Sequence, residues 1–283
     1  MERTKIIGEI GINFAYGKDK SSFLDNIKKL IDVAYISGCD YVKFQKRNPI
    51  VCVPEEQKNK PKNVPWRDEE ITYLDYKKDI ELTHSDYVNI DDYCKLKGIK
   101  WFASVWDKDS VDFMSKFTDI MKIPSALITD LDLCSYAREK CRYLIISTGM
   151  STEEEVVKCV DTCNPNLIMH TNSTYPSQVD ELNLEYIKWI KDVIAKPNVD
   201  VGYSGHEFGL MTTVSTILLG STWIERHITT DRTLWGSDQM ASVEPQGLIK
   251  LVKSIRDIEK AMGGYGPRKV MGGELLKQKS LRK

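Results

Sequence analysis

The segment VDVGYSGHEFGLMTTVSTILLGSTWIERH, residues 199–227, decides the fold because it contains a complete strand–helix–strand repeat. Val199–Tyr203 and Thr222–His227 are short runs rich in β-branched and aromatic residues. Between them, Gly209–Leu219 has the apolar spacing of a helix. This order predicts two parallel strands joined by a helical crossover.

The same alternation runs through most of the chain. Six further strands are predicted at Lys5–Ile10, Asp40–Gln45, Trp101–Trp106, Ile120–Ile123, Tyr143–Ser147 and Leu167–Thr171. Helices are predicted at Ser21–Ser37, Ser85–Lys97, Lys108–Lys116, Leu131–Lys140, Thr152–Cys163, Leu184–Ile194 and Pro245–Met262. Eight such units favour a closed (β/α)8 TIM barrel of the α/β class over an open doubly wound sheet. We expect one barrel domain over residues 1–265.

Two segments interrupt this rhythm. Asn48–Lys78 is a long polar stretch that includes Pro54, Pro61 and Pro65, and we expect it to be a functional or disordered loop. The tail, residues 266–283, is rich in glycine and basic residues, and we expect it to be irregular.

Composition excludes several classes of function. The net charge is −1, so no electrostatic argument supports binding to nucleic acid or to an anionic membrane. No apolar run reaches membrane-spanning length, and the N-terminus has no signal-peptide pattern. The seven cysteines are scattered, without a C-x-x-C pair, which favours reduced thiols and a cytoplasmic location.

Two of the four histidines follow the last two predicted strands in matching positions. His206 comes shortly after Val199–Tyr203, and His227 ends Thr222–His227, with Glu225 two residues before it. Neighbouring parallel strands bring such residues to one edge of a sheet. A lone strand histidine is more often a core residue, but two imidazoles placed in this way indicate a divalent-metal site.

The other strand ends add charged and hydroxyl groups to the same mouth of the barrel, where barrel enzymes carry their chemistry. Burial of a lysine without an anion is unfavourable, so Lys43 and Lys122 predict an anionic substrate such as a phosphate or carboxylate. Hydroxyl and amide donors from these ends would complete the anion site.

The order of these motifs resembles the sialic acid synthase family, the phosphoenolpyruvate-dependent nonulosonate synthases. The resemblance covers nearly the whole chain and rests on residues 6–13 (IIGEIGIN), 42–45 (VKFQ), 104–107 (SVWD), 122–125 (KIPS), 147–150 (STGM), 173–176 (STYP), 225–229 (ERHIT) and 236–242 (GSDQMAS). The family fold is the same barrel that the alternation predicts.

The resemblance implies a reaction and a role for each site residue. A divalent metal, with Mn²⁺ favoured and Mg²⁺ or Co²⁺ open, would bind His206 and His227 and polarise the aldehyde of an open-chain sugar. C3 of phosphoenolpyruvate would attack that carbonyl, with release of phosphate. Glu9 would be the acid/base carboxylate, and Glu225 and Asp238 would contact the sugar. Phosphoenolpyruvate would be held by Lys43, Ser104, Lys122, Asn172, Ser173, Tyr175 and Ser204.

Two departures from the family pattern bear on the sugar. Phe14 follows Asn13, where many members have histidine. Members usually continue into a small antifreeze-like domain that gives an arginine to the partner's site in a homodimer, whereas this sequence stops at Lys283. Three explanations are open: a shorter family member, a separate chain that completes the site, or a fragment of a longer protein. In a shorter member, the long loop 48–78 would take over recognition of the sugar.

Two other functions stay open. A metal-dependent aldolase or isomerase on the same barrel would not consume phosphoenolpyruvate. A non-catalytic sugar-phosphate-binding relative would bind ligand without turnover, although the intact set of charged residues disfavours it. The acceptor sugar itself, whether N-acetylmannosamine, its 6-phosphate or a diacetamido hexose, is not determined by the sequence.

Overall fold

The computed structural model describes residues 3–282, and within them eight parallel strands form a closed barrel, which confirms the predicted (β/α)8 fold. The order around the barrel is β1-β10-β9-β8-β7-β6-β5-β2. Their bounds are β1 Lys5–Glu9, β2 Tyr41–Lys46, β5 Lys100–Val105, β6 Ile120–Ile123, β7 Tyr143–Ser147, β8 Leu167–Thr171, β9 Asp200–Gly205 and β10 Trp223–His227.

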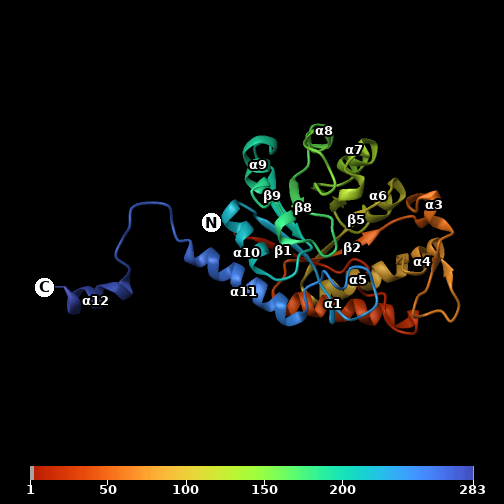
Figure 1. Cartoon of the computed structure of the whole chain (residues 1–283), viewed down its shortest axis with the longest axis horizontal. Helices are drawn as coiled ribbons and strands as arrows, with labels where there is room; N and C mark the ends of the chain where they lie inside the picture. Colours follow the sequence, from red (N-terminus) through yellow and green to blue (C-terminus); the bar gives the residue numbers. More distant parts are fainter. Residues whose placement is uncertain (1–2, 283) are drawn as a thin grey trace.

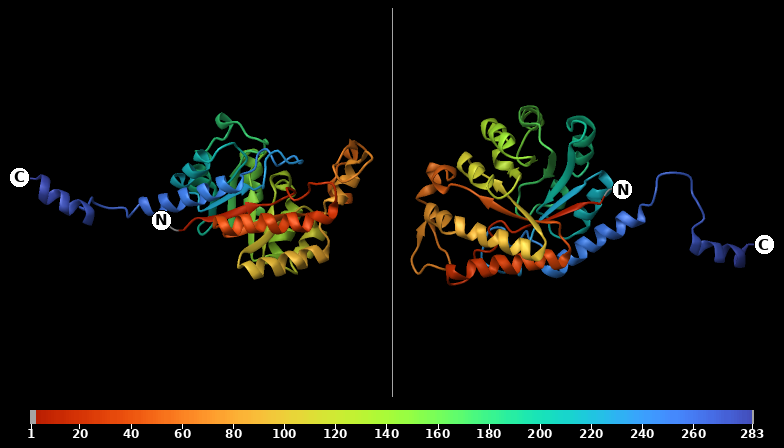
Figure 2. Two further views of the ribbon diagram at one scale, coloured as in Figure 1. Left: turned by 90° about the horizontal axis from the view of Figure 1, so that it is seen from below. Right: turned by 180° about the vertical axis from the view of Figure 1, so that it is seen from behind.

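Helices surround the strands on the outside (Figures 1 and 2). They are α1 Phe23–Ser37, α5 His84–Lys97, α6 Lys108–Met114, α7 Leu131–Lys140, α8 Glu153–Cys163, α9 Tyr186–Trp189, α10 Met211–Ser215 and α11 Pro245–Ala261. The predicted helix Leu184–Ile194 is divided between α9 and a π-helical turn at Ile190–Ile194. None of the helices described is long and apolar enough to cross a membrane.

Apolar side chains close the barrel interior at the end opposite the polar mouth. Tyr41 stacks on Trp223 with ring centroids 5.3 Å apart, and Phe102 meets Tyr41 edge-on. Ile7, Ile145, Leu167 and Met169 complete this buried cluster. The mouth is therefore the end at which the barrel can hold polar groups around a ligand.

The segment 48–78, expected to be a functional or disordered loop, is ordered and contains short helices and strands. It forms α2 Pro49–Cys52, α3 Glu55–Lys58, the antiparallel strands β3 Pro61–Lys62 and β4 Ile71–Thr72, and the start of α4 Tyr73–Asp79. We call residues 48–79 the β2 excursion. Trp66 anchors it, because this buried ring packs edge-on against both Phe23 of α1 and Trp235 in the loop after β10.

The tail also differs from the prediction. Gly272–Leu281 forms the helix α12 rather than irregular chain, and its N-terminal turn has Glu274 accepting a hydrogen bond from the Met271 backbone N–H. Figure 1 shows α12 well away from the barrel, joined to α11 by an extended segment.

Candidate active site

A cavity of about 210 Å³ opens at the carboxyl ends of the barrel strands. Strand register brings its charged residues to one level, since Glu9 of β1 pairs with both Lys43 of β2 and His227 of β10. The residues that line it are Glu9, Lys43, Gln45, Ser104, Trp106, Lys122, Pro124, Ser125, Ala126, Met150, Thr171, Ser173, Tyr175, Ser204, His206, Glu225 and His227.

Four buried charges form an ionic cluster at the floor of this cavity. The Lys43 ammonium lies 2.8 Å from Glu9 Oε2 and 3.6 Å from Glu225 Oε1, and Lys122 Nζ lies 2.8 Å from the same Glu225 oxygen. Lys43 Nζ also donates to Ser104 Oγ at 3.0 Å. The protein itself supplies part of the negative charge that these lysines require, because the two ammonium groups contact two carboxylates.

The two carboxylates have opposite pKa shifts. Burial raises the pKa of Glu9 to about 7, although Lys43 acts to lower it. Burial acts in the same direction on Glu225, but the charges of Lys122 and Lys43 lower its pKa to about 2. Glu225 is therefore a permanent anion at neutral pH, while Glu9 is suited to gain and release a proton there.

The two histidines converge as predicted. The ring centroids of His206 and His227 are 5.3 Å apart, and Tyr175 stacks on His206 at 4.0 Å. His206 Nδ1 lies 2.6 Å from the carbonyl oxygen of Asn172. A carbonyl oxygen only accepts, so Nδ1 carries the proton and Nε2 keeps its lone pair.

The electrostatics of the two rings suit a cation. Burial, with His227 nearby, lowers the pKa of His206 to about 3, and burial, with Lys43 nearby, does the same for His227. Both rings are thus neutral at pH 7, the form that ligates metals. Among residues 3–282 no group of three or more His, Cys, Asp or Glu side chains is arranged to hold a metal, so the protein offers two imidazole nitrogens.

A second buried ion pair lies outside the barrel wall, directly behind the histidines. Arg226 precedes His227 and Glu207 follows His206. The Arg226 guanidinium lies 3.4 Å from Glu207 Oε1 and donates to the Thr213 hydroxyl at 2.6 Å and to the Glu207 carbonyl at 2.5 Å. Tyr203 donates to the other Glu207 oxygen at 2.9 Å. This network joins the ends of β9 and β10 and so holds the backbone on which both imidazoles are carried.

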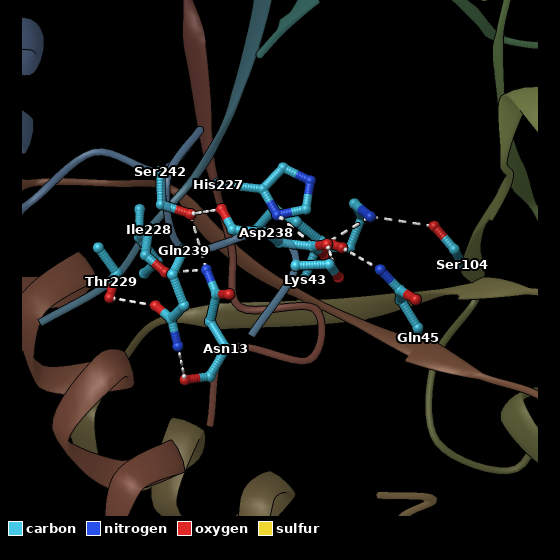
Figure 3. Close-up of polar contacts among 12 residues, drawn as sticks. Asn13, Lys43, Gln45, Ser104, His227, Ile228, Thr229, Asp238, Gln239 and Ser242 are labelled. Carbon is cyan, nitrogen blue, oxygen red and sulfur yellow. Dashed lines mark hydrogen bonds and ion pairs between the residues drawn. The ribbon is translucent and has the colours of Figure 1, made fainter. Parts of the chain in front are cut away.

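The loop after β10 is fixed by Asn13, a fully buried residue in the turn that follows β1 (Figure 3). Asn13 Nδ2 donates to the Ile228 carbonyl at 2.9 Å and to Ser242 Oγ at 2.7 Å, while Gln239 Nε2 donates to the Asn13 carbonyl at 3.1 Å. Ser242 in turn donates to the carbonyl of Asp238 at 2.6 Å. These contacts place an Asp238 carboxylate oxygen 3.7 Å from His227 Nδ1.

The structure brings most of the predicted site residues to the cavity wall, but Asn172 and Asp238 do not line it. The Asn172 side chain accepts hydrogen bonds from Thr174 N and Thr174 Oγ1 and donates to the Glu181 carbonyl. Its contribution to the site is the backbone carbonyl that orients His206. Asp238 stands beside His227, at the rim.

Sequence reasoning assigned no role to several residues that the structure brings to this site. Gln45 donates to Glu9 Oε1 at 3.1 Å, and Asn13 positions the rim loop. Arg226 stands between Glu225 and His227, so the period-2 rule already places it on the opposite face of the strand. This alternation indicates from the sequence alone that Arg226 points out of the barrel, where it forms the network with Glu207.

Comparison with known proteins places these features in a family. The NeuB family profile matches residues 30–266. The chain is 31% identical to an N,N'-diacetyllegionaminic acid synthase of Campylobacter jejuni, over 93% of this chain and 78% of that protein. It is 33% identical to the human N-acetylneuraminate-9-phosphate synthase, over 91% of this chain and 71% of that one.

A solved structure agrees with the sequence relatives. The N-acetylneuraminic acid (sialic acid) synthetase from Leptospira borgpetersenii, crystallised in complex with citrate, superposes with a TM-score of 0.82 at 26% identity. The match covers 100% of this chain and 93% of that one. The family resemblance that the motifs indicated is confirmed.

Proposed function

We propose, from the premise that this chain belongs to the NeuB family, that it condenses phosphoenolpyruvate with the aldehyde of an acetamido sugar. The products are a nonulosonic acid and inorganic phosphate. The observation that carries the proposal is a single cavity in which two lysines, an ionisable glutamate and two neutral histidines meet. The enzyme class follows from relatives that are synthases of legionaminic and N-acetylneuraminic acids.

Lys43 and Lys122 would bind the phosphate and carboxylate of phosphoenolpyruvate, assisted by hydroxyl groups. Ser104 already accepts from Lys43, and Ser204 donates to Glu225 at 3.2 Å, so both hydroxyls lie within reach of the ionic cluster. Binding then exchanges contacts to Glu9 and Glu225 for contacts to the substrate anion. Fixing the two reactants face to face supplies much of the rate enhancement.

The chemistry needs proton transfer at three points. C3 of phosphoenolpyruvate forms a bond to the aldehyde carbon, whose oxygen becomes an alcohol on gaining a proton. Water then adds at C2 and loses one proton. The C2–O bond to phosphate breaks as the new C2 hydroxyl gives its proton to the departing phosphate and becomes the ketone. Glu9, with its pKa near 7, is the carboxyl group we assign to the proton taken from that water.

We further propose that His206 and His227 bind a divalent cation, with Mn²⁺ favoured over Mg²⁺ and Co²⁺. When bound, the cation would act as a Lewis acid on the aldehyde oxygen. The support is chemical: both rings are neutral, and the Asn172 carbonyl fixes the His206 tautomer, as carbonyls commonly do for metal-ligating histidines. A homodimer and a cytoplasmic location remain predictions.

Phosphate release tests the proposal. The enzyme is assayed with phosphoenolpyruvate, N-acetylmannosamine, its 6-phosphate or a diacetamido hexose, with and without Mn²⁺. Release should require both an acceptor and the metal, and it should vanish in His206→Ala/His227→Ala. His84→Ala is the matched control, because His84 packs against Phe113 and Phe117 away from the cavity. Turnover of a sugar acid without phosphoenolpyruvate would instead indicate an aldolase, and binding without any product a non-catalytic relative.

A further inference from the structure

Three cations, one directly after β2 and two in the β2 excursion, lie near the active-site mouth without a carboxylate partner. The ion pairs of this region join Lys46 to Glu81, Arg67 to Asp79 and Lys78 to Asp75. None of the ion pairs formed within residues 3–282 includes Arg47, Lys62 or Lys77. We call these three residues the rim cations.

Aromatic rings and the cavity wall hold the rim cations in place. The Lys77 ammonium lies 5.2 Å and 5.0 Å from the ring centroids of Tyr73 and Tyr76, and that of Lys62 lies 5.5 Å and 5.4 Å from Tyr76 and Trp235. The Arg47 guanidinium stacks 4.4 Å from the centroid of Trp106 and donates to Gln45. Trp106 and Gln45 both line the catalytic cavity, so Arg47 adjoins it directly, while Lys62 and Lys77 lie behind it on the Tyr73, Tyr76 and Trp235 rings.

The rim cations lie close enough together to repel one another. Burial and the neighbouring Arg47 lower the pKa of Lys77 to about 8, with Lys62 contributing in the same direction. Asp238 and Glu81 are the carboxylates whose charges act on Lys77, and Glu81 is already paired with Lys46 at 2.6 Å. Around Lys77, two further cations are thus opposed by a single carboxylate without a lysine or arginine partner, Asp238, which stands beside His227. Such an arrangement is unfavourable unless a ligand supplies negative charge.

Carbon numbering identifies which end of a substrate would lie there. Phosphoenolpyruvate contributes three carbons, so C1 of a hexose becomes C4 of the product and C6 becomes C9. With the aldehyde at C1 placed beside His227 and the sugar in contact with Asp238, as the family resemblance implies, the far end of the sugar would extend towards the rim cations. A phosphate on C6 would supply the dianion that the rim cations lack.

We propose that the rim cations Arg47, Lys62 and Lys77 form a subsite for the phosphate of a phosphorylated acceptor sugar, so that the substrate is an aldohexose 6-phosphate. This inference rests on the proposed function and names its substrate class. It assigns acceptor recognition to the β2 excursion, whose Trp66 anchor sets the position of the subsite.

Calorimetric binding tests the subsite independently of turnover. The wild type and the double variant Lys62→Met/Lys77→Met are each titrated with N-acetylmannosamine 6-phosphate, N-acetylmannosamine and inorganic phosphate. Methionine removes the charge of each lysine but keeps an aliphatic side chain on the aromatic rings. Lys78→Met is the matched control, a neighbouring lysine paired with Asp75 at the surface. The wild type should bind the sugar phosphate roughly 10- to 100-fold more tightly than the sugar, as expected for charge-assisted hydrogen bonds. The double variant should lose that factor and Lys78→Met should keep it.

Three results would overturn the subsite. The first is that the wild type binds the sugar and the sugar phosphate with equal affinity. The second is that the double variant loses the same factor of affinity for both. The third is that inorganic phosphate binds as tightly as the sugar phosphate and loses affinity to the same extent in the double variant. Failure of the proposed function has a different signature, because phosphate release from phosphoenolpyruvate would then be absent with every acceptor while the binding difference persisted.

Discussion

Glu225→Gln should destabilise the protein strongly and make phosphoenolpyruvate a better stabiliser. The Glu225 side chain is 3% exposed, and its Oε1 lies 2.8 Å from Lys122 Nζ and 3.6 Å from Lys43 Nζ. Glutamine has the same shape, so the change removes charge and leaves no cavity. Removing one partner of a buried ion pair costs about 3–5 kcal/mol. Burial lowers the pKa of Lys122 while Glu225 acts to raise it, so loss of the Glu225 charge lowers that pKa further and eases removal of the proton, and we expect the lower end of this range.

A loss of about 3 kcal/mol corresponds to a fall in Tm of roughly 6–12 °C for a chain of this size. The assay is thermal unfolding in the presence of a chelator, with and without phosphoenolpyruvate. Because the ligand returns negative charge to the two lysines, its stabilising shift should be larger in Glu225→Gln than in the wild type.

The matched control is Glu244→Gln. Glu244 pairs with Arg232 at 3.2 Å, but both side chains are about 40% exposed, and such pairs contribute less than about 1 kcal/mol. If Glu225→Gln lowers Tm no more than Glu244→Gln does, or if phosphoenolpyruvate shifts both variants equally, the ionic cluster does not have the role assigned here.

Three further predictions concern other parts of the site. Arg226→Met should leave Glu207 buried without its partner and lower the free energy of unfolding by about 3–5 kcal/mol. Mn²⁺ affinity, measured by calorimetry, should be roughly 10- to 100-fold weaker. An unchanged Mn²⁺ affinity would show that the Arg226–Glu207 network does not position the histidines. Preference for a phosphorylated acceptor should be greatest near pH 7, where the phosphate is a dianion, and should decline as the pH rises through about 8 and Lys77 loses its proton. Lys77→Arg should abolish that decline, and a decline that persists in this variant would contradict the assignment. A Cβ at Gly149 would lie 2.2 Å from Ser173 Oγ. Gly149→Ala should therefore raise the KM for phosphoenolpyruvate at least about tenfold and lower the free energy of unfolding by about 1–3 kcal/mol. A variant with wild-type kinetics would refute this close packing.

The barrel could be predicted from local patterns because each of its units carries its own signal. Ile120–Ile123, Tyr143–Ser147 and Leu167–Thr171 form strands with the predicted bounds, since each is a short apolar run between polar turns. Parallel strands place their carboxyl ends together, and that alone brought His206 and His227 to one mouth.

The contacts that were not predicted depend on register and on distant partners. Lys43 was expected to need an external anion, because a single sequence does not show that Glu9 lies opposite it on the next strand. The short elements of the β2 excursion were not predicted, because they are two to seven residues long and carry no periodic signal. Its anchor, Trp66, packs against Trp235, which lies 169 positions later in the chain.

A crystal structure of the enzyme soaked with phosphoenolpyruvate and Mn²⁺ tests the catalytic assignment most directly. We predict density for the metal between His206 and His227, and for the phosphorylated acid within hydrogen-bond distance of Lys43 and Lys122. Metal bound away from these rings, or the acid held by other residues, would contradict it.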